Sequence, residues 1–551
     1  MTDRAPLPPT ADLDTHSVAN QPEFGADRDL WVDDPALVAL ARAFQADMGN
    51  LAALGASLGR AEMRQRARAA QRSKPELVTF DRSGRRLDEV QFHPAYHDLL
   101  THGLGAGYAA GPWTGGRHTT HAAHVYLWSQ VEPGVCCPMT MTYAAVPALA
   151  IDPALAELWA AKASISEYDP AIRPAAEKRA LTLGMAMTEK QGGSDVRANT
   201  TRAELDGDAF RLTGHKWFCS APMSDGFLTV AQAPGGLTCF LVPRWLPDGR
   251  NAIHLMRLKD KVGNTANASA EIEYHGAHAH RLGADGDGVR TIIRMVHHTR
   301  LDTAMAPAGL MRAALDEALR WCAGRTAFQR RLIDQPLMRA VLADLTLDAT
   351  GALAFALRVA AATDAGTEEE AAFARVAVAL AKYLSNKRCP TVIAEAMEAM
   401  GGMGYVEDTP LPMLYREAPL NGIWEGSGNV ICLDILRALS RDPAASEALY
   451  AELDAARGSH TDYDAALASA RARWPGVPPE VEARAFAERM ACLLTAAVLL
   501  RHLPGPVADG YAATRLGQGE RGLTPGTAAL DADGILGTVN GDAETIPWTP
   551  S

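Results

Sequence analysis

The chain has 551 residues, 48% hydrophobic and 21% charged, which is typical of soluble globular proteins with several buried cores. Its formal net charge of −12 argues against a large nucleic-acid footprint for the chain as a whole. Eight cysteines without a C-x-x-C pair, the lack of any apolar run of 18 residues and an N-terminus unlike a signal or transit peptide predict a cytoplasmic protein with no disulfide framework and no membrane partner.

The predicted elements follow the order helices, β domain, helices. The first residues are rich in Pro and Asp and predict a loosely ordered arm. From Asp33 to about Leu149, apolar residues recur at spacings of three and four, which predicts helices. Near residue 183 the period changes to short β-rich runs separated by Gly, Pro and Asp turns. The helical period returns at about residue 289 and continues to about Leu503, before a Gly/Pro-rich, weakly patterned tail.

We therefore expect a mainly α-helical protein with a small central β domain. Its predicted parts are an N-terminal arm (1–30), an N-terminal helical domain (31–182), a β domain (183–288), a helical bundle domain (289–440) and a C-terminal helical extension with a tail (441–551).

A basic segment lies within the N-terminal domain. Residues 60–86 carry nine Lys/Arg and three Asp/Glu. Runs of charge are usually solvated helix faces or subunit contacts, and we favour that interpretation here.

Three histidines follow this segment at spacings of three, His118, His121 and His124. On one helix they could contact a metal, but no Cys, Asp or Glu nearby completes a ligand set. We favour a structural or exposed role for them and predict no metal.

The stretch MTEKQGGSDV (187–196) lies where helix gives way to strand. Gly192, Gly193 and Ser194 would expose backbone N–H groups beside a hydroxyl, an arrangement that can hold an anion or a ring carbonyl. An ordinary turn explains the same residues equally well, since Gly and Ser are common in turns.

In GHKWFCS (214–220), strand alternation places Trp217 and Phe218 on opposite faces. One face could cover a flat heterocycle, or the ring could be a core aromatic. GGMGY (401–405) permits close approach of the backbone, and Arg325 follows a helix.

The last motif, NGIWEGSGNV (421–430), holds a single carboxylate, Glu425. It follows Ile423 and Trp424 and precedes a run of small residues and a helical pattern. It could be a first-turn acid that serves the helix dipole, a surface residue or a catalytic base.

Together, at these spacings, the motifs of residues 180–440 resemble those of the acyl-CoA dehydrogenases, which are FAD flavoproteins. The resemblance implies an α-helical N-terminal domain, a β-sheet domain and a four-helix bundle, followed here by the C-terminal extension. It also implies Glu425 as the base that takes a proton from the carbon α to a thioester, while a hydride leaves the β carbon for flavin N5. An apolar site would raise the pKa of this carboxylate and strengthen the base.

The resemblance also assigns binding residues. It implies that Ser194 and Arg300 bind substrate and that a larger set contacts FAD: Met187, Thr188, Gly193, Ser194, Trp217, Phe218, Ser220, Arg325, Gly402, Ser427 and Asn429. Phe218 stands where the family has a flavin-covering Trp, with Trp217 as the alternative ring. Arg325 is similar to an arginine that reaches FAD phosphates across a subunit boundary.

Two positions depart from the family pattern. Glu398 stands where the family has a Gln near the diphosphate, and His297 stands at the family's active-site Asp. Both changes should affect how a CoA thioester is held.

The long N-terminal region, the motifs MTEKQGGSDV and IWEGSGN, and the C-terminal segment resemble the AidB-type subfamily, which is associated with the response to DNA alkylation. This implies a homotetramer and, as an alternative function, a flavin-containing protein that binds double-stranded DNA and has little dehydrogenase activity.

Residues 441–551, however, contain nine Arg, no Lys and fifteen Asp/Glu, a net charge of about −6, which is the wrong sign for binding phosphates. The basic segment at 60–86, or a groove formed on oligomerisation, is the better DNA candidate. The acyl chain and the electron acceptor stay open.

Overall fold

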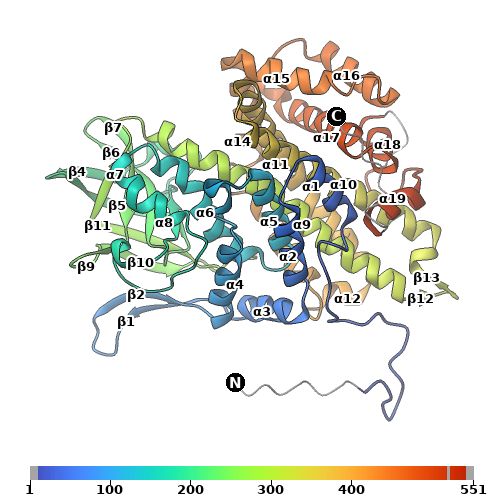
Figure 1. The fold of residues 1–551 in the computed structure, drawn as a ribbon, viewed down its shortest axis with the longest axis horizontal. Coiled ribbons are helices and arrows are strands. Elements are labelled where there is room, and N and C mark those ends of the chain that lie inside the picture. The colour runs from blue at the N-terminus through green and yellow to red at the C-terminus, as the bar shows by residue number, and fades with distance from the viewer. Residues whose placement is uncertain (1–9, 518–521, 541–551) are drawn as a thin grey trace.

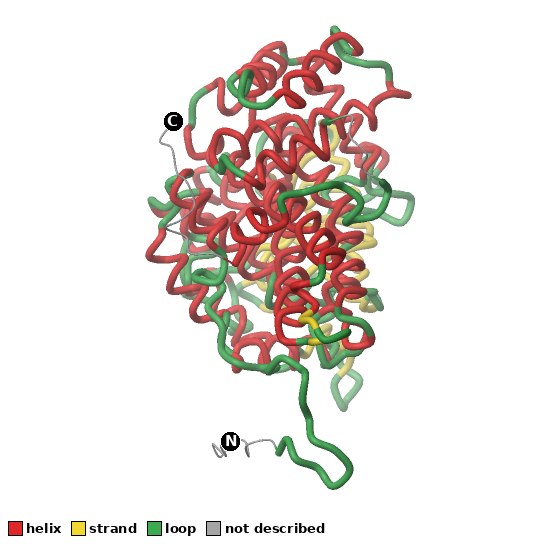
Figure 2. Tube along the Cα trace, turned by 90° about the vertical axis from the view of Figure 1, so that its right-hand side faces the viewer, coloured by secondary structure: helices red, strands yellow, loops and turns green. Residues whose placement is uncertain are grey.

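The computed structural model describes residues 10–517 and 522–540. Figure 1 shows a β domain at one end, long helices through the middle and the C-terminal helices beyond them. In Figure 2, the segment before the first helix is a loop that extends beyond the helical body. The predicted class, mainly α with a central β domain, is confirmed.

The N-terminal domain is built from short helices, and several of them begin at acidic caps. Asp34 accepts a hydrogen bond from Leu37 N, and Asp47 accepts one from Asn50 N, which satisfies free donors in each first turn. The helices are α1 (Pro35–Ala43), α2 (Met48–Leu58), α3 (Ala61–Arg72), α4 (Pro94–Gly105), α5 (His118–Ser129), α6 (Pro133–Leu149), α7 (Pro153–Leu155) and α8 (Ala161–Ala163).

A hairpin interrupts this domain where the sequence analysis predicted helices throughout. Strands β1 (Glu76–Phe80) and β2 (Arg86–Gln91) pair antiparallel. The helical prediction was wrong here because the dominant apolar period of the flanking helices hid two short alternating runs around a turn. Gly84, at φ +78°, supplies the left-handed backbone of that turn.

The β domain is a seven-stranded sheet in the order β10-β11-β5-β4-β6-β3, and β7 pairs with both β11 and β6. Alternate residues of each strand fill a core that includes Leu212, Phe227, Phe240 and Tyr274. The strands of this sheet are β3 (Leu183–Ala186), β4 (Arg202–Asp206), β5 (Ala209–Ser220), β6 (Gly226–Ala233), β7 (Gly236–Pro243), β10 (Ile253–Leu258) and β11 (Ser269–Leu282). A separate two-stranded sheet pairs β8 (Trp245–Leu246) with β9 (Gly249–Arg250).

A bulge in β5 corrects the prediction for its two aromatic residues. Trp217 and Phe218 together stand opposite one residue of β11, so the alternation of the strand is broken. Lys216 and Cys219, on either side of the bulge, are both buried. The ammonium of Lys259 lies 3.2 Å from the Trp217 ring centroid and 4.8 Å from that of Phe218. Both rings therefore project away from the core, and their predicted placement on opposite faces was wrong.

Four long helices form the bundle, with short elements between them. The helices are α9 (Gly288–Gly324), α10 (Pro336–Ala365), α11 (Glu368–Ala399) and α14 (Gly428–Arg441), and the short elements are β12 (Thr326–Ala327), β13 (Arg330–Arg331), α12 (Gly402–Tyr405) and α13 (Leu411–Glu417). By length and composition α10 could cross a membrane, but 83% of its most apolar window is buried inside the protein. Its packing against α9, α11 and α17 accounts for that composition.

The C-terminal extension continues the helical packing further than its sequence pattern suggested. Its helices are α15 (Pro443–Asp454), α16 (Thr461–Arg473), α17 (Ala483–His502), α18 (Pro506–Tyr511) and α19 (Ala532–Asn540). The weakly patterned tail after Leu503 thus contains two helices, and Ile535, Leu536 and Val539 of α19 are buried. Most of the predicted tail is ordered by packing on α10 and α1 rather than by its own periodicity.

Two buried acids mark the place where the three domains meet. Glu132 caps α6, accepting from Val135 N at 2.9 Å, and also accepts from Gln71 Nε2 at 3.1 Å. Glu417, at the end of α13, accepts from Asn264 Nδ2 at 2.9 Å. Burial raises the pKa of Glu132 to about 8, with the nearby charge of Glu417 adding to the effect. Glu132 is therefore largely protonated in the folded protein at neutral pH.

The first prediction concerns the pH dependence of stability. A carboxyl whose folded-state pKa lies above its unfolded value stabilises fully only below that unfolded value, and the contribution is lost as pH rises through the folded pKa. We expect E132Q to gain stability over the native protein as pH rises from about 5 to about 8. Melting temperatures measured across this window test it, with E62Q, at an exposed acid of α3, as the control. Parallel curves for E132Q and the native protein would contradict the prediction.

Candidate active site

Glu425 lies in the turn between α13 and α14 with an unusual backbone. Its φ of +57° is in the left-handed region, which costs a non-glycine residue energy and is concentrated at functional sites. The residue is half-buried and follows Trp424, whose Nε1 donates to Asn421 Oδ1 at 2.7 Å. Among the described residues, the N–H of Glu425 has no acceptor. The turn thus presents a carboxylate and a backbone donor from the same residue.

Two buried cations hold this turn in place. Lys382 of α11 donates to Asn421 O at 2.8 Å and to Gly426 O at 2.9 Å, on either side of the carboxylate. Arg300 of α9 donates through Nε to Glu425 O at 3.2 Å. These three hydrogen bonds join α9 and α11 to the turn and supply the rigidity that its strained residue needs.

The pKa of Glu425 is raised above its usual value, mainly by burial. A hydrogen bond with Thr299 and the charges of Arg300 and Lys382 oppose this rise. Burial also lowers the pKa of Lys382 to about 7, although the charge of Glu425 acts in the opposite direction. The acid and the lysine are therefore coupled, and the charge of one changes the pKa of the other.

Arg300, predicted to bind substrate, has partners within the protein. Its Nη1 lies 2.6 Å from Asp434 Oδ2, and Arg375 Nη2 lies 2.9 Å from the other oxygen of Asp434. The guanidinium is buried and braces the turn. Beside it, burial together with Arg375 and Arg300 lowers the pKa of His297 to about 4, so this imidazole is neutral at pH 7.

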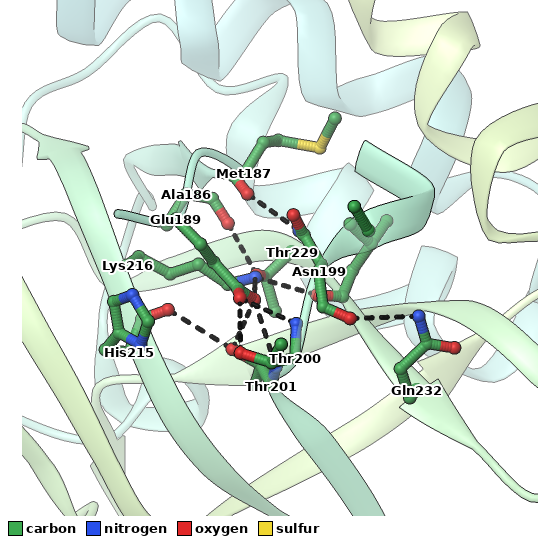
Figure 3. Close-up of polar contacts among 12 residues, drawn as sticks. Ala186, Met187, Glu189, Asn199, Thr200, Thr201, His215, Lys216, Thr229 and Gln232 are labelled. Atoms are coloured by element: carbon green, nitrogen blue, oxygen red, sulfur yellow. Dashed lines mark hydrogen bonds and ion pairs between the residues drawn. The ribbon is translucent and has the colours of Figure 1, made fainter. Parts of the chain in front are cut away.

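The loop of residues 187–196 is anchored by a buried carboxylate (Figure 3). Glu189 Oε1 accepts from Lys216 Nζ at 3.0 Å and from Thr201 Oγ1 at 2.6 Å. Its other oxygen accepts from Thr200 N at 2.7 Å. These partners hold the pKa of Glu189 well below its usual range, so the acid is ionised and paired in the sheet core. The loop is therefore a built structure and not an ordinary turn.

The predicted flavin-contacting residues of this loop follow from that anchor. The carbonyl of Thr188 accepts from Trp217 N at 2.7 Å, and the carbonyl of Met187 accepts from Asn199 Nδ2 at 2.9 Å. A Cβ on Gly193 would lie 2.4 Å from Thr188 Oγ1, so only glycine fits there. Ser194, beyond it, is exposed.

Cys137 of α6 lies between the sheet and the Glu425 turn. Its thiol hydrogen-bonds with the Ser220 hydroxyl at the end of β5 and lies near enough to Glu425 for the two charges to interact. Ser220 in turn lies 3.3 Å from Ser269, oxygen to oxygen. The structure therefore brings the end of β5 close to the Glu425 turn.

The other predicted contacts lie around this centre or away from it. Ser427 is the exposed N-cap residue of α14 and makes no side-chain capping bond, and Asn429 accepts from Arg484 of α17 at 3.1 Å. Gly402 begins α12 in open space. Arg325 lies at the far end of α9, beside the N-terminal arm, and is not brought to Glu425 within one chain.

Sequence reasoning missed the residues that support the site. No motif contains Lys382 or Asp434. The pair Glu189–Lys216 lies within MTEKQGGSDV and GHKWFCS, but the sequence analysis assigned neither residue a role. Charged residues at otherwise apolar helix positions were the available signal for Lys382 and Asp434, because such residues are rarely buried without partners.

The three histidines considered as a metal site have structural roles. His118, His121 and His124 bond separately to Tyr143, Asp302 and Asn50, and no metal-binding cluster occurs within residues 10–517 and 522–540.

Much of the basic segment is an intramolecular contact. The guanidinium of Arg68 donates to the carbonyls of Glu407 and Asp408, and that of Arg72 donates to Glu407 O at 3.2 Å. Lys74 pairs with Asp260 at 2.7 Å.

Comparison with known proteins gives one consistent result. Residues 20–170 match the adaptive response protein AidB N-terminal domain, residues 184–277 the acyl-CoA dehydrogenase middle domain, and residues 286–440 the acyl-CoA dehydrogenase C-terminal domain. AidB of Escherichia coli (strain K12), provisionally named an acyl-CoA dehydrogenase, is 42% identical over 510 residues, covering 90% of this chain and 94% of that protein.

Two solved structures extend the similarity to the whole fold. Caenorhabditis elegans ACDH-11 in complex with C11-CoA has a TM-score of 0.81 at 26% identity and 96% coverage of both chains. Bd2924 in its apo-form has a TM-score of 0.79 at 28% identity, covering 88% of this chain and 99% of that one.

The second prediction tests the anchor of the 187–196 loop. Removing one partner of a buried ion pair leaves an uncompensated charge, and we expect K216M to destabilise the protein by about 3 kcal/mol. The double variant E189Q/K216M removes both charges and should recover part of that loss. Urea unfolding at pH 7 measures both variants. A double variant less stable than K216M would show that the pair is not what anchors the loop.

Proposed function

Because this chain belongs to the acyl-CoA dehydrogenase family, in its AidB-type branch, we propose that it oxidises an acyl-CoA thioester with Glu425 as the base. The chain is a flavoprotein oxidoreductase, and its cofactor is FAD. The observation that carries the proposal is the strained turn, which joins a carboxylate of raised pKa to a free backbone N–H.

The residues present fit a flavin. Phe218 is 47% exposed on the bulge of β5, a large ring that a planar cofactor would cover. The N-terminus of α14 leaves backbone donors free behind Ser427, and a helix N-terminus suits an anionic group. When bound, FAD accepts at its N5 the hydride that leaves the β carbon of the substrate.

Glu425 takes the proton from the α carbon. The α C–H of a thioester is a weak acid, so the base must be aligned and the developing enolate charge must meet fixed donors. Burial raises the basicity of the Glu425 carboxylate. Its own N–H, which has no acceptor among the described residues, would donate to the thioester carbonyl. Lys382 and Arg300 keep both groups in position through the carbonyls of the turn.

The substrate follows from the same groups. With Arg300 paired to Asp434 and His297 neutral, the pantetheine end would be held by uncharged donors such as Ser194 and the loop backbone. The ACDH-11 structure, which holds C11-CoA, supports an acyl-CoA with an extended chain as the substrate class.

The third prediction tests the reaction. Anaerobic addition of acyl-CoA should bleach the flavin absorbance, and E425Q should slow bleaching at least about 100-fold, the usual contribution of a positioned base. FAD content measured on the same samples should be unchanged in E425Q. No bleaching across short, branched and long acyl-CoAs would contradict the proposed dehydrogenase activity.

The fourth prediction concerns pH. The base acts ionised, so the bleaching rate should fall as pH drops through the raised pKa of Glu425. K382M removes a cation that lowers this pKa, so its pH–rate profile should shift to higher pH, whereas K382R should shift it less. Identical midpoints in all three proteins would show that Lys382 does not act on the base.

Duplex DNA binding, the alternative function, has less support. The basic segment is largely occupied by internal contacts, and the C-terminal extension carries net negative charge. Titration of labelled duplex at several salt concentrations tests it. A steep fall in affinity with salt that flattens when the exposed Arg82 and Arg85 are replaced would favour DNA binding over the proposed activity.

A further inference from the structure

The N-terminal arm runs beside the end of α9, where Arg325 lies. Asn20 holds the first residue of β12 from both sides, with Asn20 Nδ2 donating to Thr326 O at 2.9 Å and Asn20 Oδ1 accepting from Thr326 N at 2.6 Å. The arm backbone also contacts the arginine itself, since Arg325 Nη1 donates to Asn20 O at 3.0 Å. One arm residue thus fixes both the backbone and the guanidinium of this corner.

Packing around these hydrogen bonds shows that the arm is fitted to the helix. A Cβ on Gly324 would lie 2.8 Å from Pro22 Cβ, so the arm approaches as closely as glycine allows. The ring of Phe24 lies 5.9 Å from that of Trp321, and the Arg325 guanidinium lies 5.3 Å from the Trp321 ring. Trp321 is therefore contacted by both the arm and the arginine.

A salt bridge attaches the arm to α9 about one turn before Trp321. Arg28 Nη1 lies 3.1 Å from Asp316 Oδ2, and Arg28 Nη2 lies 2.6 Å from Glu317 Oε1. All three side chains are largely buried in this contact. Between Asn20 and Arg28, the arm is thus attached to α9 at both ends.

Arg325 has little else to hold it. The residue follows the last turn of α9 and precedes the short hairpin β12–β13, whose tip residues Phe328 and Gln329 both have positive φ. Phe328 is 96% exposed, so the hairpin projects from the body with no core beneath its tip. A long arginine side chain in such a place loses conformational entropy when it binds a ligand, unless neighbouring groups restrict it beforehand.

We propose that the arm segment Asn20–Arg28 is a clamp that preorganises Arg325 for the FAD phosphates of a neighbouring copy of the chain. This rests on the proposed function, which assigns Arg325 to FAD. Asn20 acts through Arg325 and is a positioning residue, while Arg325 is the contact. An arm that the sequence marks as loosely ordered thereby becomes a determinant of cofactor affinity.

The test measures FAD affinity directly. FAD is titrated into flavin-free full-length protein and followed by flavin fluorescence. N20G removes the amide without straining the backbone, because Asn20 already has φ +58° and glycine tolerates it. We expect N20G to weaken FAD binding about tenfold, from the loss of paired hydrogen bonds. S17A is the matched control, because within the described part of the chain Ser17 Oγ bonds only to the arm itself, at Asp12 Oδ1, 2.7 Å away.

A double variant separates positioning from a general structural effect. If the arm acts through Arg325, then N20G/R325A binds FAD no more weakly than R325A alone. Additive losses, or an N20G affinity equal to that of the native protein while R325A is weakened, would overturn the clamp but leave the Arg325 assignment intact. An unchanged affinity in R325A would overturn both. Light scattering on each sample verifies that the oligomeric state is the same.

Discussion

The ammonium of Lys382 is the interaction on which the active site depends. It is buried, and it reaches the carbonyls of Asn421 and Gly426 in a turn where Glu425 and Gly426 both have positive φ. Without a donor at that point, two carbonyls would be unsatisfied in the interior, and the strained turn would have no reason to persist. A lysine gives three donors from one charge, which suits a site that must bind two oxygens and still influence a nearby acid.

Charged groups with more than one partner occur elsewhere in the molecule as well. They include Glu189 within the β domain, Asp434 between two arginines of the bundle, and Arg358 between Glu370 and Glu452. Such groups add little net stability when compared with apolar replacements, but they penalise any other register of the contacting elements. The precision of the site therefore comes from electrostatics, while the stability of the fold comes from alanine- and leucine-rich helix packing.

The sequence was sufficient for the class of fold and for selecting Glu425 as a candidate, because helical period, strand period and a motif containing small residues are local signals. It failed where tertiary context decided the outcome. The β5 bulge is set by pairing with β11, and α19 is formed by docking rather than by its own pattern. Arg300 shows the limit most clearly, since a motif gives its position but only Asp434, more than 130 residues later, decides what its guanidinium binds.

Arg312 has a consequence for how the two ends of the described chain are attached. This buried residue of α9 donates to the carbonyl of Asp33, just before α1, and to that of Val539 in α19, so it joins the two extremities of the described chain. The same guanidinium pairs with Asp34 and with Asp316. A substitution that undocks α19 would therefore remove one acceptor of Arg312 and leave the start of α1 attached to α9.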